Sequence, residues 1–317
     1  MSDSKFTIDI LLATYNGEQF LAQQLDSLLA QTIRNFRILV RDDGSTDSTK
    51  KILKEYQNKF PEVIIRIIED DLGNIGVAQN FNILMQSTNA EYLCFCDQDD
   101  VWLKNKLEVS IKEIQKLENG NNTVPCMVYS DMTVINEQDE IIHQSMWKVH
   151  KTYEEYFTFN RLLVYNIPFG CTMMINQALA KLACPIGKHA IYHDHWIALL
   201  IAAFGKFKAI DQQLILLRNH ANNTSFRIKL SFAQKMIKKI KNAVTKTQHK
   251  YWLNLRIEQA KDFRNNYKDK LNKKDLQTID AFISIEKRTG FGRKFAYVKN
   301  GFFKPDLLQT VKMILKA

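Results

Sequence analysis

Hydrophobic positions near the start of the chain alternate between continuous runs and runs with helical spacing. Short apolar segments that each end at a turn signal predict four β-strands, at 6–13, 36–41, 63–69 and 91–96. Apolar side chains three or four positions apart predict helices between them, at 18–31, 48–59 and about 77–86, with Ser45 or Asp47 as the cap of the second. Strands that alternate with helices predict an α/β protein with a mainly parallel sheet, covered on both faces because its strands are continuously apolar.

The rest of the chain has a less regular pattern. Further strands are expected at 127–135, 170–176, 207–210 and 214–218, and a further helix at 194–204. From Ser231 onward the pattern is helical and basic: residues 226–317 hold 23 Lys and Arg against 7 Asp and Glu, whereas 1–225 hold 21 against 27. This change in charge predicts a boundary near residue 225 and a second task for the basic part.

Composition narrows the class of protein. The 317 residues are 45% hydrophobic and 25% charged, which is typical of a globular protein. Five cysteines without CxxC spacing argue against a disulfide framework or a zinc ribbon, and Cys94 and Cys96 are interpreted as buried thiols. The first residues lack the pattern of a signal peptide, and the most apolar window, 196–204, is too short to cross a bilayer. We therefore expect a cytoplasmic protein that does not span the membrane.

Polar motifs follow the predicted strands. They are Thr14-Tyr15-Asn16-Gly17, Asp42-Asp43-Gly44-Ser45 and Asp97-Gln98-Asp99-Asp100. Because ligands of such sheets bind beyond the carboxyl ends of the strands, we expect the three motifs to meet at one edge. Three carboxylates in four residues repel one another unless a cation offsets them, so the last motif can hold Mg²⁺ or Mn²⁺ against a diphosphate. An isolated acidic turn exposed to solvent is the alternative.

Other residues at this edge can recognise a nucleotide. Asp43 can accept hydrogen bonds from a base or a ribose, and Tyr15 can stack on the base, although both residue types also serve as ordinary turn and packing residues. Asn74, Gly76 and Asn80 form a glycine-containing turn that enters a helix. The absence of a GxGxxG or P-loop pattern disfavours a dinucleotide or ATP site.

The motifs together resemble a known family. ILLATYNG, VRDDGSTDST, GNIGVAQNFN and FCDQDDVW, in this order, are similar to the family 2 glycosyltransferases with the GT-A fold, over roughly residues 6–225. DQDDVW with the later HDHW and RNHANN resembles bacterial rhamnosyltransferase-like members that build surface polysaccharide. The resemblance implies a Rossmann-like catalytic domain over 1–225, with a nucleotide-sugar half (about 1–100) and an acceptor half (about 101–225). A basic helical region, 226–317, would follow.

The resemblance also implies roles for single residues. An inverting enzyme needs a carboxylate base, and Asp194 occupies the matching position, where it would also suit a helix cap. Donor contacts would come from Thr14, Tyr15, Asn16, Asp43, Asn74, Gly76, Asn80, Asp97 and Gln98. Asp97, Asp99 and His220 would bind Mn²⁺ or Mg²⁺, although a lone histidine after a strand is more often structural. The acceptor side would include Asp100, Trp102, His193, His195 and Trp196, of which the two histidines would either orient Asp194 or only pack.

Two other classes of function compete with this interpretation. The basic C-terminal part suggests nucleic-acid binding, but it lacks an aromatic-interleaved recognition motif, so no nucleic-acid partner is expected. A nucleotidylyltransferase would need a basic glycine-rich loop after the first strand, and TYNGE has no basic residue. Among sugar donors the resemblance favours dTDP-L-rhamnose, with UDP-galactose, UDP-glucose and UDP-N-acetylhexosamines as alternatives. It favours lipid-linked or oligosaccharide acceptors.

The C-terminal segment 304–316 has one apolar helical face. The face consists of Leu307, Leu308, Val311, Ile314 and Leu315, bordered by Lys304, Lys312 and Lys316. It can pack on the catalytic domain or on a second subunit of a homodimer. It can also lie on the anionic inner surface of the cytoplasmic membrane, beside a lipid-linked acceptor.

Overall fold

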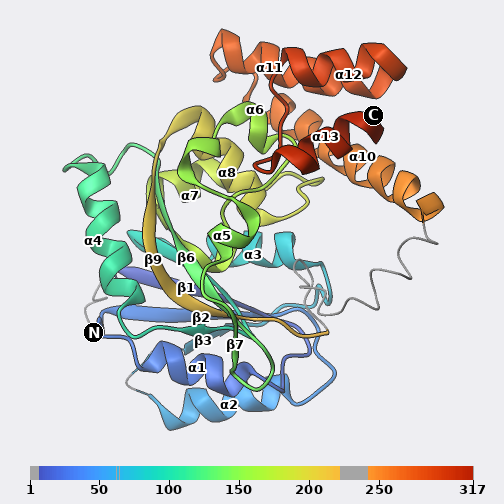
Figure 1. Cartoon of the computed structure of the whole chain (residues 1–317). Helices are drawn as coiled ribbons and strands as arrows, with labels where there is room; N and C mark the ends of the chain where they lie inside the picture. The colour runs from blue at the N-terminus through green and yellow to red at the C-terminus, as the bar shows by residue number, and fades with distance from the viewer. Residues whose placement is uncertain (1–6, 62, 64, 222–241, 317) are drawn as a thin grey trace.

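The computed structural model describes residues 7–61, 63, 65–221 and 242–316, with side chains from residue 250 in the last range. Its centre is a mixed sheet of strand order β3-β2-β1-β4-β8-β6-β9-β5, with β7 paired to β6 (Figure 1). The strands are β1 (Ile8–Thr14), β2 (Phe36–Asp42), β3 (Ile65–Ile68), β4 (Tyr92–Asp97), β5 (Val101–Trp102), β6 (Cys126–Ile135), β7 (Ile141–His143), β8 (Met173–Asn176) and β9 (Lys206–Arg218).

The first half of the sheet agrees with the sequence pattern. Strands β1 to β4 are parallel and are joined by α1 (Leu21–Leu29), α2 (Thr49–Lys59) and α3 (Val77–Gln86). Pairing sets Thr14 opposite Asp42 and Ala13 opposite Asp97. The predicted meeting of the three polar motifs at one sheet edge is therefore confirmed.

The second half departs from the pattern in several places. β8 is antiparallel to both neighbours, and the predicted strand 170–176 begins as a 3₁₀ turn (Gly170–Thr172), because this segment turns into the sheet before it pairs. The two strands expected between 207 and 218 are one strand, β9, whose pairing with β6 shifts register near Asp131. The helix α4 (Lys106–Glu118) was not expected.

Helices cover both faces of the sheet, because alternate strand residues point to opposite sides. Ile10, Leu12 and Cys94 pack in a core with α1, α2 and α4. Leu11, Leu93 and Phe95 pack in a second core with α3, α7 (Gln177–Ala183) and α8 (His193–Phe204). Figure 1 shows α7 and α8 on the side of the sheet opposite to α1 and α2. Both cysteines of β4, Cys94 and Cys96, are buried free thiols, as predicted.

The C-terminal helices α10 (Asn242–Tyr267), α11 (Lys273–Ile283), α12 (Gly290–Lys299) and α13 (Leu307–Lys316) share the second core. The ring of Phe263 on α10 meets that of Trp196 on α8 at 5.4 Å, edge to face. The expected boundary near 225 and the helix start at Ser231 fall outside the described residues, so the division into domains stays a prediction. None of the helices in the described ranges has the length and apolarity that a membrane crossing needs.

The last helix exposes most of its predicted apolar face. α13 buries Thr310 and Met313, with Ile314 partly buried beside them. Leu307, Leu308 and Leu315 are 77%, 60% and 69% exposed. Most of this face therefore does not pack on the catalytic domain, because the helix is rotated so that Thr310, Met313 and, in part, Ile314 meet the core.

Candidate active site

Gln98 joins the loops that follow β1 and β4. Its Oε1 accepts from the backbone N–H of Tyr15 at 2.8 Å, and its Nε2 donates to the Tyr15 carbonyl at 2.9 Å. A Cβ at Gly17 would lie 2.2 Å from Gln98 Oε1, so a side chain there would displace the Gln98 amide. Gln98, predicted to contact the donor, thus uses its amide to hold the two loops together.

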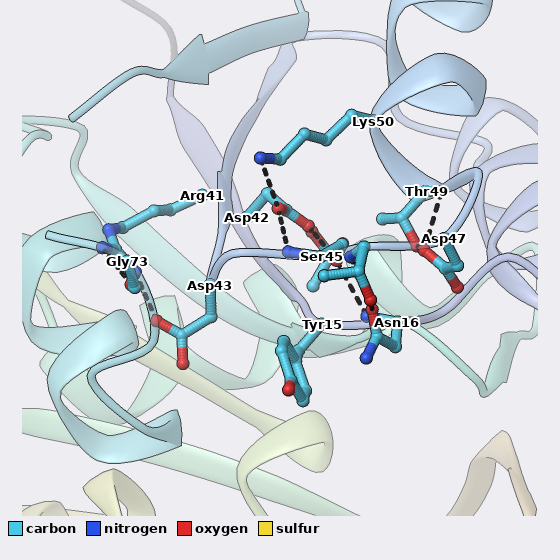
Figure 2. Close-up of polar contacts among 12 residues, drawn as sticks. Tyr15, Asn16, Arg41, Asp42, Asp43, Ser45, Asp47, Thr49, Lys50 and Gly73 are labelled. Atoms are coloured by element: carbon cyan, nitrogen blue, oxygen red, sulfur yellow. Dashed lines mark hydrogen bonds and ion pairs between the residues drawn. The ribbon is translucent and has the colours of Figure 1, made fainter. Parts of the chain in front are cut away.

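The loop after β2 is tied to the loop after β1 (Figure 2). The Asp42 carboxylate accepts from Thr14 Oγ1 at 2.9 Å and from the Ser45 backbone N–H at 2.7 Å. Ser45 Oγ accepts in turn from the Asn16 backbone N–H at 2.8 Å. Tyr15 remains 47% exposed, so its ring is available for stacking. Of the two predicted helix caps, Asp47 bonds the Thr49 N–H of α2 and Ser45 does not cap.

Asp43 is buried at the start of the same loop. Its carboxylate accepts from Arg41 Nη1 at 2.7 Å and from the backbone N–H groups of Ile75 and Gly76, each at 2.9 Å. Figure 2 shows Arg41 reaching from β2 to both Asp43 and Gly73. Asp43 therefore fixes the turn that contains Asn74, and its contact with a nucleoside stays a prediction. The predicted donor residue Asn80 is buried and donates to the Arg41 carbonyl at 3.3 Å.

Arg41 itself was missed by the sequence analysis. Besides Asp43 it binds both carboxylate oxygens of Asp70, at 2.7 and 2.9 Å. Burial works against its charge, and the two carboxylates outweigh burial, so the pKa of Arg41 is raised. In the sequence, its role could have been inferred from an arginine that directly precedes two aspartates at the end of a predicted strand.

Two carboxylates at this edge of the sheet, Asp97 and Asp194, have pKa values above the usual range for aspartate. Burial, and then the negative charges of Asp99 and Asp194, raise the pKa of Asp97 to about 7. Within the described residues no hydrogen-bond donor contacts its carboxylate. Burial also raises the pKa of Asp194 to about 7, although hydrogen bonds from Gly170 (3.0 Å) and His195 (2.6 Å) partly oppose this. Asp97 and Asp194 thus come close enough to repel each other, as two parts of one site do.

Asp194 lies in the first turn of α8. One of its oxygens accepts from the backbone N–H of the next residue, His195. The N-cap position belongs to Tyr192, so Asp194 is an acidic residue of the first turn and not the cap itself. The other oxygen reaches back to the Gly170 N–H at the start of the 3₁₀ turn. A Cβ at Gly170 would approach His193 Nε2 to 2.4 Å, so a side chain there would push on the element that carries Asp194.

The residues around the DQDD loop fit a hard divalent cation. Asp97 and Asp99 offer carboxylate oxygens, and His220 Nε2 lies 2.7 Å from Asp99 Oδ2, so a ring nitrogen is also at hand. Carboxylate oxygens suit Mg²⁺ and Mn²⁺, and a single imidazole is compatible with Mn²⁺. Ligand atoms of Asp97, Asp100 and Cys171 lie within 4.8 Å of one another. Burial raises the pKa of the Cys171 thiol well above its usual value, so it stays protonated and is a poor ligand.

Arg218 is a second residue that the sequence analysis missed. It is 1% exposed at the end of β9, where its backbone N–H donates to Asp100 at 3.1 Å and its Nε to the Asp99 carbonyl at 3.1 Å. Its guanidinium also binds Asp139 at 2.6 Å and lies 4.6 Å from the ring of Phe20. Arg218 therefore sets the shape of the DQDD loop. In the sequence, only its place in the RNH motif indicated that Arg218 belongs to the site.

The side chains predicted for the acceptor side lie inside the protein. Trp196 is fully buried against Phe263, and Trp102 is buried with Lys106 Nζ 3.8 Å from its ring. Asp100 is also buried, and its carboxylate accepts a hydrogen bond from the Arg218 backbone N–H. An aromatic or acidic residue near a site motif does not reveal from sequence which way it points.

The two histidines beside Asp194 are buried as well. His193 packs between the rings of Phe81 (3.9 Å) and Phe95 (4.8 Å), and burial lowers its pKa to about 3. His195 Nε2 lies 2.5 Å from the Leu162 carbonyl, and its Nδ1 lies 3.2 Å from Gln259 Nε2. Both rings therefore support α8, as the packing alternative predicts.

Comparisons with known proteins identify relatives of this chain. A family model described as "Glycosyl transferase family 2" matches residues 9–183. An uncharacterized glycosyltransferase of Nostoc sp. is 26% identical over 220 residues, 68% of this chain and 66% of its own. The dTDP-rhamnosyl transferase RfbG of Shigella flexneri is 34% identical over 123 residues, 38% of each chain. In both matches the aligned part is less than two thirds of the relative's length.

Solved structures share the fold at low sequence identity. TarS 1-349 of S. aureus, in complex with UDP-GlcNAc, has a TM-score of 0.59 and 15% identity, covering 97% of this chain and 81% of its own. The mannosyltransferase PcManGT from Pyrobaculum calidifontis, in complex with GDP-Man and Mn²⁺, has a TM-score of 0.52 and 14% identity, covering 99% and 86%. The GT-A arrangement expected from the sequence motifs is thus confirmed.

Proposed function

The chain belongs to glycosyl transferase family 2, and we propose that it transfers a sugar from a nucleoside diphosphate to an acceptor hydroxyl with inversion at the anomeric carbon. The observation that carries this proposal is the pair Asp97 and Asp194: two carboxylates from different elements, each with a pKa near 7, at one edge of the sheet. Asp97 suits the binding of a cation, and Asp194 suits proton transfer.

The base in this proposal is Asp194. Its carboxylate takes the proton of the acceptor hydroxyl while that oxygen forms a bond to the anomeric carbon. The bond from this carbon to the diphosphate breaks on the opposite face, and the nucleoside diphosphate leaves. A base with a pKa near the working pH is the most effective, and burial gives Asp194 such a pKa. The Gly170 and His195 amides keep the carboxylate in one orientation.

The donor side of the proposal uses the strand-end loops. Asp97, Asp99 and His220 would hold Mn²⁺ or Mg²⁺, which would neutralise the departing diphosphate. The exposed ring of Tyr15 would stack on the base, beside Asp43 and the turn that contains Asn74. PcManGT, whose solved complex contains GDP-Man and Mn²⁺, supports this arrangement through its similar fold.

The sugar we favour is L-rhamnose from dTDP-rhamnose, because RfbG is a dTDP-rhamnosyl transferase by name. UDP-galactose, UDP-glucose and UDP-N-acetylhexosamines are the alternatives. A thermal-shift panel of these donors, with Mn²⁺ or with EDTA, decides among them. A true donor should raise the melting temperature only with Mn²⁺. At a donor concentration of 100 times Kd, binding adds about 2.7 kcal/mol to the free energy of unfolding. If no nucleotide sugar raises it, the proposed function is wrong.

The acceptor we propose is a lipid-linked glycan of bacterial surface polysaccharide, reached from the membrane surface. An exposed apolar surface on α12 and α13, formed by Phe291, Phe295, Leu307, Leu308 and Leu315, supports this. We call it the apolar C-terminal surface. Phe291 is 84% exposed, and Lys299, Lys312 and Lys316 on the same helices are exposed to solvent. Apolar side chains with flanking lysines favour an anionic bilayer surface, at ~1 kcal/mol per lysine.

Flotation with liposomes tests this surface. The protein should bind phosphatidylglycerol vesicles at low salt, because lysines and apolar side chains act together, and binding should weaken as salt rises. The double variant Phe291→Ser/Leu307→Ser should lose most of the binding. Ile141→Ser removes an exposed apolar side chain from β7 (56% exposed) and should change nothing. A concentration-dependent dimer that the double variant abolishes, with no vesicle binding, would instead assign the surface to a second copy.

A further inference from the structure

Two cationic side chains near the segment that leads into α8 lack an acidic partner. Arg256 is on α10 and Lys304 precedes α13. In the part of the chain that the structure describes, neither forms a salt bridge. The guanidinium of Arg256 lies 5.8 Å from the ring of Trp252, and Lys304 Nζ lies 5.6 Å from the ring of Tyr165, so their nearest recorded partners are uncharged aromatic faces.

Helix geometry brings Arg256 to the N-terminal end of α8. Gln259, which follows Arg256 by three residues, lies 3.2 Å from His195 Nδ1 and accepts from the Ile191 N–H at 2.8 Å. Residues three apart share one face of a helix, so Arg256 faces the segment that leads into α8. The pKa of His195 agrees with this placement of Arg256. Burial is the main cause that lowers this pKa to about 4, and the positive charge of Arg256 lowers it further.

A separate part of the chain brings Lys304 to the same place. Its neighbour Tyr165 is held by a 2.9 Å hydrogen bond between its hydroxyl and His150 Nδ1. The next residue, Asn166, contributes a hydrogen bond that lowers the pKa of Asp194. Burial, then the positive charges of Arg256 and Lys316, lower the pKa of Lys304 to about 8. Lys304 and Arg256 therefore lie within electrostatic reach of each other.

Two partly buried like charges destabilise the folded protein unless an anion joins them. Two carboxylates of these C-terminal segments already have partners: Asp306 pairs with Lys151 at 2.9 Å and Asp262 with His189 at 3.0 Å. Arginine and lysine together are the side chains that most often bind phosphate oxygens. Uncompensated positive charge at the N-terminal end of α8, the helix that carries Asp194, therefore favours a phosphate ligand.

We propose that Arg256 and Lys304 form an anion site that binds a phosphate or diphosphate group carried by the sugar acceptor. The proposal rests on the proposed function, because it takes the hydroxyl that reaches Asp194 to belong to the same molecule. Lys304 is three residues from Leu307 of the apolar C-terminal surface. An acceptor that joins a diphosphate to a hydrocarbon chain would therefore meet charge and apolar surface in succession.

Calorimetric titration with inorganic pyrophosphate in EDTA tests the site, because chelation removes metal-dependent binding at the DQDD loop. Wild-type protein should bind pyrophosphate, and Arg256→Gln and Lys304→Gln should each weaken binding at least tenfold. Lys274→Gln, which removes an exposed lysine of α11, should leave it within twofold. Lys304→Arg keeps the charge and should keep the affinity, so a loss caused by misfolding is recognised. Wild-type affinity in both glutamine variants, or no binding to the wild type, would overturn the proposal.

Further arms separate this site from the donor site and from a bilayer. Asp99→Asn should retain EDTA-resistant binding, whereas loss of it would show that pyrophosphate enters the donor site and would overturn the proposal. Geranyl diphosphate should compete with pyrophosphate. Competition by phosphatidylglycerol vesicles alone would assign the site to bilayer headgroups and overturn its link to the acceptor. If pyrophosphate binds as expected and no nucleotide sugar does, the anion site stands and the proposed function fails.

Discussion

Replacing Asp194 by asparagine is expected to lower kcat by roughly 10²–10⁴-fold and to leave the affinity for the donor unchanged. Asparagine keeps the size of the side chain and can still accept one of the two backbone hydrogen bonds from Gly170 and His195. It cannot take a proton from the acceptor. Release of nucleoside diphosphate from the donor that the thermal-shift panel identifies, with lipid-linked glycan supplied, measures the rate.

The pH dependence of this reaction has a defined sign. Asp194 must be charged to accept a proton, and its pKa is raised to about 7 by burial. Activity at saturating metal should therefore fall as the pH falls through 7, and the residual rate of Asp194→Asn should not follow that titration. Asp211→Asn, an exposed change on β9, is the matched control and should behave as wild type. A parallel loss of donor affinity in Asp194→Asn would make Asp194 a binding residue instead.

Replacing Asp99 by asparagine is expected to remove the metal-dependent part of the affinity for UDP or dTDP. It should also lower transfer by about 10²-fold or more, because a bound cation contributes several kcal/mol of charge stabilisation. Asp99 Oδ2 lies 2.7 Å from His220 Nε2, so the two side chains present their atoms together. His220→Gln should therefore weaken metal binding in the same direction.

The fold of the Asp99 variant should remain intact, since the DQDD loop is held through other groups. Gln98 fixes it to Tyr15, and the Arg218 side chain binds the backbone carbonyl of Asp99, which the substitution keeps. Asp269→Asn, at an exposed position that follows α10, is the control. Wild-type transfer by Asp99→Asn without added metal would show that these carboxylates are not metal ligands.

The sequence allowed the first half of the sheet and the meeting of its polar loops to be predicted. Parallel strands of continuous apolar character have few possible arrangements, so TYNG, DDGS and DQDD had to end at one edge. The antiparallel insertion of β8 could not be predicted, because a short apolar segment fits either direction and long-range pairing decides between them. The orientation of α13 likewise depends on which side of the helix meets the core.

The supporting residues of the site were harder to foresee than the motif residues. Arg41 and Arg218 act through partners that are distant in sequence: Asp70 is 29 residues from Arg41, and Gln23 is 195 residues from Arg218. Trp102 and Trp196 lie beside motif residues in the chain, yet both point into the core. Neighbourhood in sequence therefore predicted where chemistry occurs, but only the packing revealed which side chains face the ligand.

The central claim is that the edge formed by Asp97, Asp99 and His220 binds a divalent cation together with a nucleoside diphosphate. Electron paramagnetic resonance of Mn²⁺ measures this directly, because the signal of free Mn²⁺ falls when the ion is bound. We expect wild-type protein with UDP or dTDP to remove one Mn²⁺ per chain from the free pool, beyond what the nucleotide binds alone, and Asp99→Asn to remove little. A free Mn²⁺ signal that the wild-type protein leaves unchanged would contradict the account.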